Sequence, residues 1–172
     1  AGGQTVTITP RAKNRPHMPE MDAIIRSGNF EEVNLGLTPE QAMTEAQRCV
    51  QCKEPTCLAG CPAEVNIKAF LHAVAEGDFL GGARIIHEVN SFPGICGRVC
   101  PQEEQCEQVC VFSKTKRPIA LGWLERFVAD YEREHGGGEV TKTGSFEGKV
   151  AIIGSGPAGL SAAGDLARMG YD

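Results

Sequence analysis

Two groups of cysteines place the strongest constraint on what this chain can fold into. The first group has the spacing C-x2-C-x4-C-x3-C-P, and the second, which starts 35 residues after the first ends, has the spacing C-x3-C-P-x4-C-x3-C. Together they hold all eight cysteines of the chain: Cys49, Cys52, Cys57, Cys61, Cys96, Cys100, Cys106 and Cys110. We therefore interpret the surrounding sequence as a scaffold for whatever these thiols bind.

Three kinds of site compete for the cysteines. A disulfide framework needs an oxidising compartment, and nothing in the sequence indicates one. Structural zinc usually takes two C-x2-C pairs for each ion, whereas the chain has a single such pair, Cys49 and Cys52. In ferredoxins with two iron–sulfur clusters, the fourth cysteine before a proline binds the other cluster, which matches the first group here. The spacing therefore favours iron–sulfur clusters.

The composition is that of an ordinary globular protein without a large basic surface. The chain has 172 residues, 41% of them hydrophobic and 23% charged, and its net charge is −5. Basic residues are scattered, so nucleic acid is an unexpected partner. No apolar run reaches the roughly 18 residues of a membrane span, and no signal peptide is visible. We therefore expect a cytoplasmic protein that does not contact a membrane.

Helix signals surround both cysteine groups. Thr38, Pro39 and Gln41 form a capping-box pattern, which predicts a helix from residue 38 to about Arg48. Asn66 is expected to cap a helix that ends at Gly77. A short helix is also predicted at 21–26, within an otherwise extended leader of residues 1–37. The loop at 90–94 is expected to lead directly into the second cysteine group.

Two further helices are expected nearby. Asp78 is expected to cap one through Val89, although two glycines weaken it by about 1 kcal/mol each. Pro118 is expected to begin the longest helix, which runs to Glu134 with an apolar face. No strand pattern is found before the polar linker at 136–148. The sequence therefore predicts a mainly α-helical iron–sulfur domain at 38–135.

The chain resembles a known family at this point. The resemblance rests on the cysteine spacing, on the segments 46–49, 97–101 and 118–119, and on a glycine motif discussed below. It is to the α-helical, ferredoxin-like domain with two 4Fe-4S clusters at the N-terminus of the glutamate synthase small subunit. Dihydropyrimidine dehydrogenase and the large subunit of the bifurcating NADH-dependent ferredoxin:NADP oxidoreductase have similar domains.

The resemblance implies how the ligands divide between two clusters. It implies that one cluster takes Cys49, Cys52, Cys57 and Cys110, and that the other takes Cys61, Cys100, Cys106 and Glu125. A glutamate in a helix is usually solvated, but Glu125 lies at the edge of the apolar face, where a buried carboxylate needs a partner. Cys96 is then the cysteine without a ligand role, and we interpret it as a small packing residue.

A glycine motif follows a short apolar run near the end of the chain. Residues 150–153 are expected to form a β-strand, and a helix is expected at 160–169. Between them lies the pattern G-x-G-x-x-G, which binds the pyrophosphate of a dinucleotide when it joins a strand to a helix. The resemblance to the family implies that this motif binds FAD through Gly154, Ser155, Gly156, Pro157, Ala158 and Gly159.

We therefore predict that residues 149–172 are the first strand and helix of a truncated Rossmann-type FAD domain. The acidic residue expected about 20 positions further on is not in this sequence. We expect the 172-residue chain alone not to retain FAD, and a yellow flavin after purification would contradict this.

Together these predictions describe part of an NAD(P)H-dependent oxidoreductase. The resemblance implies that electrons pass from NAD(P)H through FAD and the clusters to a partner, such as the large subunit of glutamate synthase. A bifurcating oxidoreductase or a pyrimidine-reductase subunit is the alternative within the enzyme class. A structural, metal-bound docking module without electron transfer is the alternative outside it.

Overall fold

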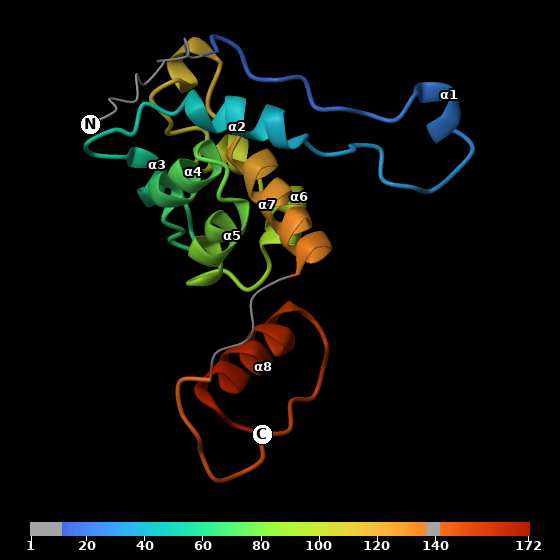
Figure 1. Cartoon of the computed structure of the whole chain (residues 1–172). Helices are drawn as coiled ribbons and strands as arrows, with labels where there is room; N and C mark the ends of the chain where they lie inside the picture. The colour runs from blue at the N-terminus through green and yellow to red at the C-terminus, as the bar shows by residue number, and fades with distance from the viewer. Residues whose placement is uncertain (1–11, 137–141) are drawn as a thin grey trace, which may run out of the picture. The chain divides into compact units, whose positions relative to one another are not determined.

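The computed structural model describes residues 12–136 and 142–172, which divide into two compact units at residues 135 and 136. The first unit is helical, and the second contains one helix (Figure 1). Within the described residues no strand is formed, and the only β-type pairing is a single antiparallel bridge between Glu20 and Asn34. None of the helices in these residues is long and apolar enough to cross a membrane.

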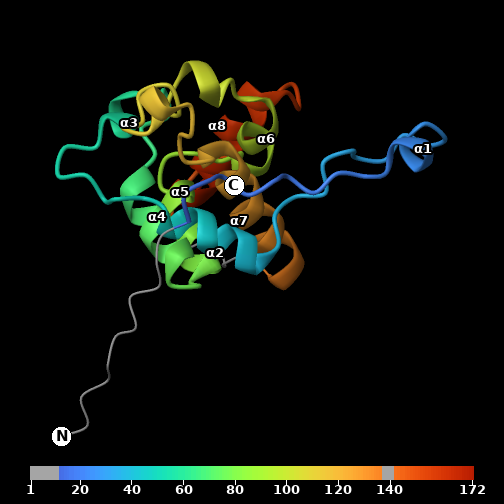
Figure 2. The same cartoon turned by 90° about the horizontal axis from the view of Figure 1, so that it is seen from above.

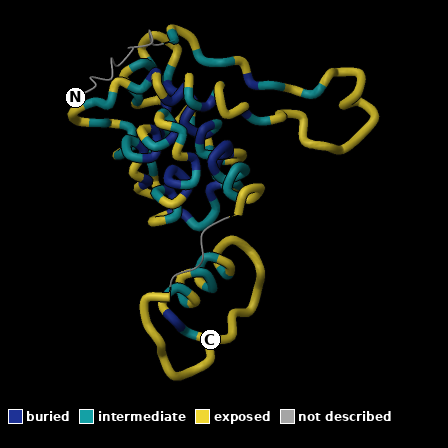
Figure 3. The backbone as a smooth tube through the Cα atoms, viewed as in Figure 1, coloured by how far each residue is buried: buried dark blue, intermediate teal, exposed yellow. Residues whose placement is uncertain are grey.

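The first unit is a bundle of short helices. Its elements are α1 (Ala23–Arg26), α2 (Pro39–Gln47), α3 (Thr56–Ala59), α4 (Ile67–Ala75), α5 (Phe79–His87), α6 (Pro93–Val99), the 3-10 turns η1 (Gln102–Glu104) and η2 (Ser113–Thr115), and α7 (Leu121–His135). Helices α2, α4, α5 and α7 bury the apolar core, which is dark blue in Figure 3. Phe70, Leu71 and Leu124 are among its fully buried side chains.

Three helix starts follow the expected capping chemistry. Thr38 and Gln41 form the reciprocal bonds of a capping box at the start of α2. The side chain of Asn66 accepts the N–H of Ala69 at the start of α4, and that of Asp78 accepts the N–H of Gly81 at the start of α5. These three predictions are confirmed because each depends only on residues within one turn of the helix.

Other boundaries differ from the predictions. The loop expected at 90–94 ends at Phe92, because helix α6 begins at Pro93, a residue suited to the first position of a helix. Helix α7 begins at Leu121 instead of Pro118, because the preceding residues Ile119 and Ala120 are buried in the core. The N–H of Ala120 donates to the buried carboxylate of Glu45 at 2.8 Å, a partner that lies 75 residues earlier in the chain.

Residues 22–35 form an exposed arm that includes α1. The arm leaves the helical bundle and returns to it, as both Figure 1 and Figure 2 show. Its base is closed by the bridge between Glu20 and Asn34, and the N–H of Met21 donates to the carbonyl of Val33 at 2.8 Å. The expected short helix at 21–26 is present, starting at Ala23 and capped by Asp22.

The second unit contains α8 (Pro157–Met169), which begins three residues earlier than expected because Pro157 occupies its first position. The expected strand at 150–153 is not formed. A strand needs a neighbouring strand to take its backbone hydrogen bonds, and none lies among the described residues. Instead, the N–H of Val150 donates to the carbonyl of Asp172 at 2.8 Å, and Ile153 is fully exposed.

Candidate metal centres

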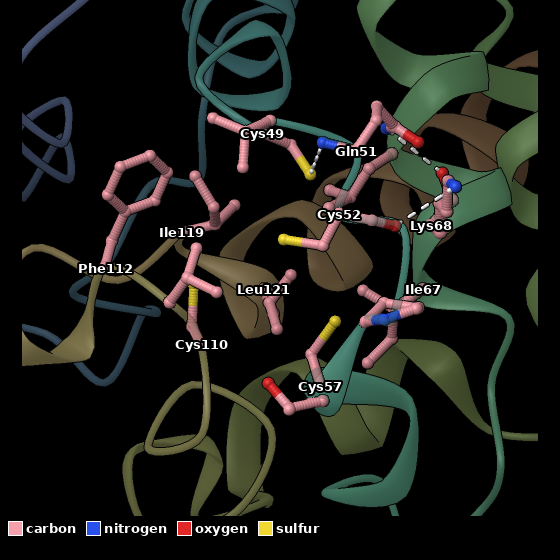
Figure 4. Close-up of a pocket in the computed structure, with 15 residues that line it drawn as sticks. Cys49, Gln51, Cys52, Cys57, Ile67, Lys68, Cys110, Phe112, Ile119 and Leu121 are labelled. Carbon is pink, nitrogen blue, oxygen red and sulfur yellow. Dashed lines mark hydrogen bonds between the residues drawn. The ribbon is translucent and has the colours of Figure 1, made fainter.

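Four thiols face one pocket in the first unit, which we call the first thiol site. It is lined by Cys49, Cys52, Cys57 and Cys110, and Figure 4 shows their sulfur atoms facing the same space. Cys49 follows the end of α2, Cys57 lies in α3, and Cys110 comes from the turn before η2. Three of these residues belong to the first cysteine group of the sequence and one to the second.

The walls of the first thiol site are largely apolar. Ile67 and Leu71 of α4 and Ile119 and Leu121 at the start of α7 contribute to them. The pKa of Cys57 is raised to about 11, mainly by burial and also by the neighbouring thiols Cys110, Cys49 and Cys52. A bound metal reverses this preference, because only the thiolate coordinates iron and binding releases the proton.

Two hydrogen bonds tie the loop of the first thiol site to α4. The ammonium group of Lys68 donates to the carbonyl of Cys52 at 3.2 Å, and the side-chain amide of Gln51 donates to the carbonyl of Lys68 at 3.3 Å (Figure 4). Gln51 has a φ of 51°, an uncommon conformation for a residue other than glycine. In that conformation its N–H donates to the sulfur of Cys49 at 3.5 Å.

A second set of donors gathers around the start of α7, and we call it the second thiol site. Its members are Cys61, Cys100, Cys106 and Glu125. The pKa of Cys106 is raised to about 12, mainly by burial and also by the nearby groups of Glu107, Cys61, Cys100 and Glu125. The thiol of Cys100 donates to the side-chain carbonyl of Gln105 at 2.9 Å. The two thiol sites thus each combine residues of both cysteine groups.

Glu125 lies partly buried in α7, and the neutral side-chain amide of Asn90 is its hydrogen-bond partner. Burial raises its pKa to about 7, which the hydrogen bond from Asn90 opposes. That bond joins the amide nitrogen of Asn90 to a carboxylate oxygen of Glu125 at 2.8 Å. A carboxylate in such a position is costly unless a cation or a metal compensates for the lost water.

Cys96 also lies beside the second thiol site. Burial raises its pKa, and the charges of Glu125 and Cys61 act in the same direction. Its thiol lies 3.7 Å from the side-chain oxygen of Asn90. Next to it, Gly97 permits α6 to approach α7, because a Cβ at Gly97 would lie 2.5 Å from the backbone nitrogen of Arg126.

The donors fit iron–sulfur clusters in chemistry, since thiolates are the usual ligands of such clusters. Within residues 12–136 and 142–172, no three His, Cys, Asp or Glu side chains converge as ligands of a single metal ion. A cubane cluster does not need that convergence, because each ligand binds a different iron.

Two buried carboxylates, Glu45 and Glu107, accept N–H groups at the start of α7, and the sequence alone did not indicate them. Glu45 accepts from Arg48 at 2.6 Å and from the N–H of Ala120. Glu107 accepts from Arg15 at 2.9 Å and from the N–H of Gly122 at 3.3 Å. Carboxylates are favourable partners for the unpaired N–H groups of a helix start.

The glycine motif of the second unit has part of the expected backbone geometry. Gly154 has a φ of 110°, which a side chain would disfavour, and Gly156 precedes the first turn of α8. A Cβ at Gly159 would overlap the carbonyl oxygen of Gly154, so the helix packs closely on the turn. Gly154, Ser155, Gly156, Pro157, Ala158 and Gly159 therefore form a turn into a helix, without the strand that was expected before it.

The geometry defines a helical domain with two thiol sites, and a comparison with known families identifies its class. A family described as dihydropyrimidine dehydrogenase domain II, 4Fe-4S cluster, matches residues 26–137. The chain belongs to this family, as the sequence resemblance predicted. It is an iron–sulfur domain of an oxidoreductase.

Individual relatives show which oxidoreductases are similar. The NAD-dependent dihydropyrimidine dehydrogenase subunit PreT of Escherichia coli (strain K12) is 39% identical over 144 residues, or 83% of this chain and 35% of the relative. The Glutamate synthase (NADPH) small chain of the same organism is 36% identical over 156 residues, or 88% of this chain and 32% of the relative. The chain thus spans about a third of the length of these relatives.

Proposed function

We propose that the chain is the electron-transfer part of an NAD(P)H-dependent oxidoreductase and holds two 4Fe-4S clusters. The observation that carries this proposal is the gathering of the cysteines into two separate thiol sites within a family of 4Fe-4S domains. We assign Cys49, Cys52, Cys57 and Cys110 to one cluster. We assign Cys61, Cys100, Cys106 and Glu125 to the other.

When bound, the clusters supply one-electron carriers. The residues of the chain hold the cluster ligands in place and set the polarity around them, which tunes the reduction potential. Apolar walls from α4 and α7 surround the first thiol site. At the second thiol site, Asn90 donates a hydrogen bond to Glu125, and Gln105 accepts one from Cys100.

The first test is iron and sulfide analysis after anaerobic purification. Two clusters require about eight irons and eight sulfides per chain, and dithionite should bleach a broad absorbance near ~400 nm. A colourless protein with bound zinc would support the structural docking module instead. A protein with about four irons would overturn the two-cluster assignment.

We further propose that residues 149–172 begin an FAD domain and that FAD passes electrons from NAD(P)H to the clusters. The glycine geometry around Gly154 and Gly159 supports this. The domain boundaries given above and the cytoplasmic location stay predictions.

Two partner proteins are candidates for the electron acceptor. The sequence favoured the large subunit of glutamate synthase, and the 36% identity to a glutamate synthase small chain supports it. The 39% identity to PreT favours a pyrimidine-reducing partner as a second candidate. Activity of a full-length protein with its partner separates them: glutamate formation with NADPH supports the first, and pyrimidine reduction with NADH supports the second.

A further inference from the structure

Asn90 lies at the point where the loop before α6 meets α7. Its side chain is buried, with 7% of the residue exposed. The amide nitrogen donates to a carboxylate oxygen of Glu125 at 2.8 Å, and the amide oxygen accepts the N–H of Phe92 at 2.9 Å. The thiol of Cys96 lies 3.7 Å from the same oxygen. One side chain therefore connects the start of α6 with the candidate ligand on α7.

The direction of these hydrogen bonds follows from their chemistry. A backbone N–H can only donate, so the atom of Asn90 that faces Phe92 must be the oxygen. The nitrogen then faces Glu125, where an ionised carboxylate can only accept. Both ends of the Asn90 amide are thus matched to their partners.

The bond to Glu125 has two consequences for a carboxylate in a poorly hydrated site. It lowers the cost of holding the negative charge without water. It also restrains rotation of the carboxylate, since a donor on a buried neighbour holds one of its two oxygens.

We propose that Asn90 is a positioning residue, which holds one oxygen of Glu125 and presents the other to an iron of the second cluster. This inference rests on the proposed function, because it requires Glu125 to be a ligand. Hydrogen bonds from neighbouring groups orient metal ligands and tune the metal in many sites. A donor that withdraws electron density from Glu125 favours the reduced cluster, so its loss should make the midpoint potential of that cluster more negative.

Two substitutions separate this role from the local role of Asn90 at the start of α6. Asn90→Asp keeps an oxygen for the N–H of Phe92 but removes the donor to Glu125. Asn90→Ser introduces no charge, and the serine side chain is too short to reach Glu125. Asn66→Asp is the matched control, because the Asn66 oxygen accepts the N–H of Ala69 at a helix start in the same way, and Asn66 is exposed.

The experiment is a reductive titration of the full chain by electron paramagnetic resonance, with iron content and circular dichroism measured on each variant. The signal that changes in Glu125→Cys identifies the second cluster. We expect both Asn90 variants to alter its line shape and to shift its potential to more negative values, or to lose about half of the iron, four of eight atoms. The first cluster and the Asn66→Asp control should keep their signals.

Unchanged line shape and potential of the second cluster in both Asn90 variants would overturn the inference. An equal change of both clusters with loss of helical signal would also overturn it, because it would indicate a structural role. Failure of the proposed function gives a different result: either the unsubstituted chain lacks two clusters, or Glu125→Ala leaves both signals intact.

Discussion

The first and second thiol sites differ in their surroundings more than in their charge. Four thiolates, or three thiolates and a carboxylate, carry the same formal charge. The first site has apolar walls and Lys68 bonded to its loop, whereas the second has amide groups bonded to Cys100 and Glu125. Because the formal charges match, a difference in reduction potential between the clusters should come from ligand type, hydrogen bonding, and the polarity and charge of the surroundings.

Both sites also share one element, the start of α7. Ile119 and Leu121 line the first site, and Glu125 belongs to the second site one turn later. The N–H groups at this helix start bind the buried carboxylates of Glu45 and Glu107. A change at a ligand should therefore affect one site, whereas a change at these carboxylates should affect both.

The largest expected effect is the loss of one complete cluster. Cys57→Ala should remove the first cluster and Cys106→Ala the second, each reducing the iron from about eight atoms per chain to about four. The two variants should lose different paramagnetic signals, because the sites have separate ligand sets. Cys96→Ala is the control and should keep both clusters. Loss of the same signal in both variants would show that the division of ligands is wrong.

Replacement of the carboxylate should give the next largest effect, confined to the second site. Glu125→Ala should lower the iron content or change the second signal, because one iron loses its ligand from the protein. Glu125→Cys should keep about eight irons per chain and make the second site resemble the first. Iron analysis and paramagnetic resonance measure both. Two unchanged clusters in Glu125→Ala would show that Glu125 is not a ligand of the second cluster.

Loss of a buried carboxylate should affect the two sites equally. Glu45→Ala leaves the buried guanidinium of Arg48 without this partner and should lower the free energy of unfolding by about 3 to 5 kcal/mol. Unfolding in guanidinium chloride, followed by circular dichroism and by cluster absorbance, measures the change. The exposed residue Glu40 on the same helix gives the control, Glu40→Ala, with an effect within about 0.5 kcal/mol. Loss of only one cluster in Glu45→Ala would contradict the shared role of α7.

The smallest expected effect is on the potential of the first cluster. Lys68→Gln keeps a hydrogen-bond donor but removes the positive charge that lies beside the first thiol site. The midpoint potential of the first cluster should become slightly more negative, because a nearby cation favours the reduced state. The shift should be small since Lys68 is partly exposed and solvent screens its charge. Lys68→Arg should stay near the original value, and a shift of the second cluster alone would contradict the comparison.

Much of the fold was predictable from the sequence alone, because it depends on local chemistry. The caps at Thr38, Asn66 and Asp78 were predictable because each bond spans only three residues. The family was also predictable, because the cysteine spacing at 49–110 carried the resemblance and lies within the matched residues 26–137. The ligand sets came from the resemblance, and the gathering of the thiols into two sites agrees with them without testing coordination.

Tertiary structure decided what depends on partners distant in the chain. Helix α7 starts at Leu121 because the backbone before it is buried and binds Glu45, and no local signal indicates a partner 75 residues away. Residues 150–153 have the composition of a strand but form none, since a strand also requires a neighbour. Asn90 meets Glu125 across 35 residues for the same reason: packing of α6 against α7, through Gly97, brings their side chains together.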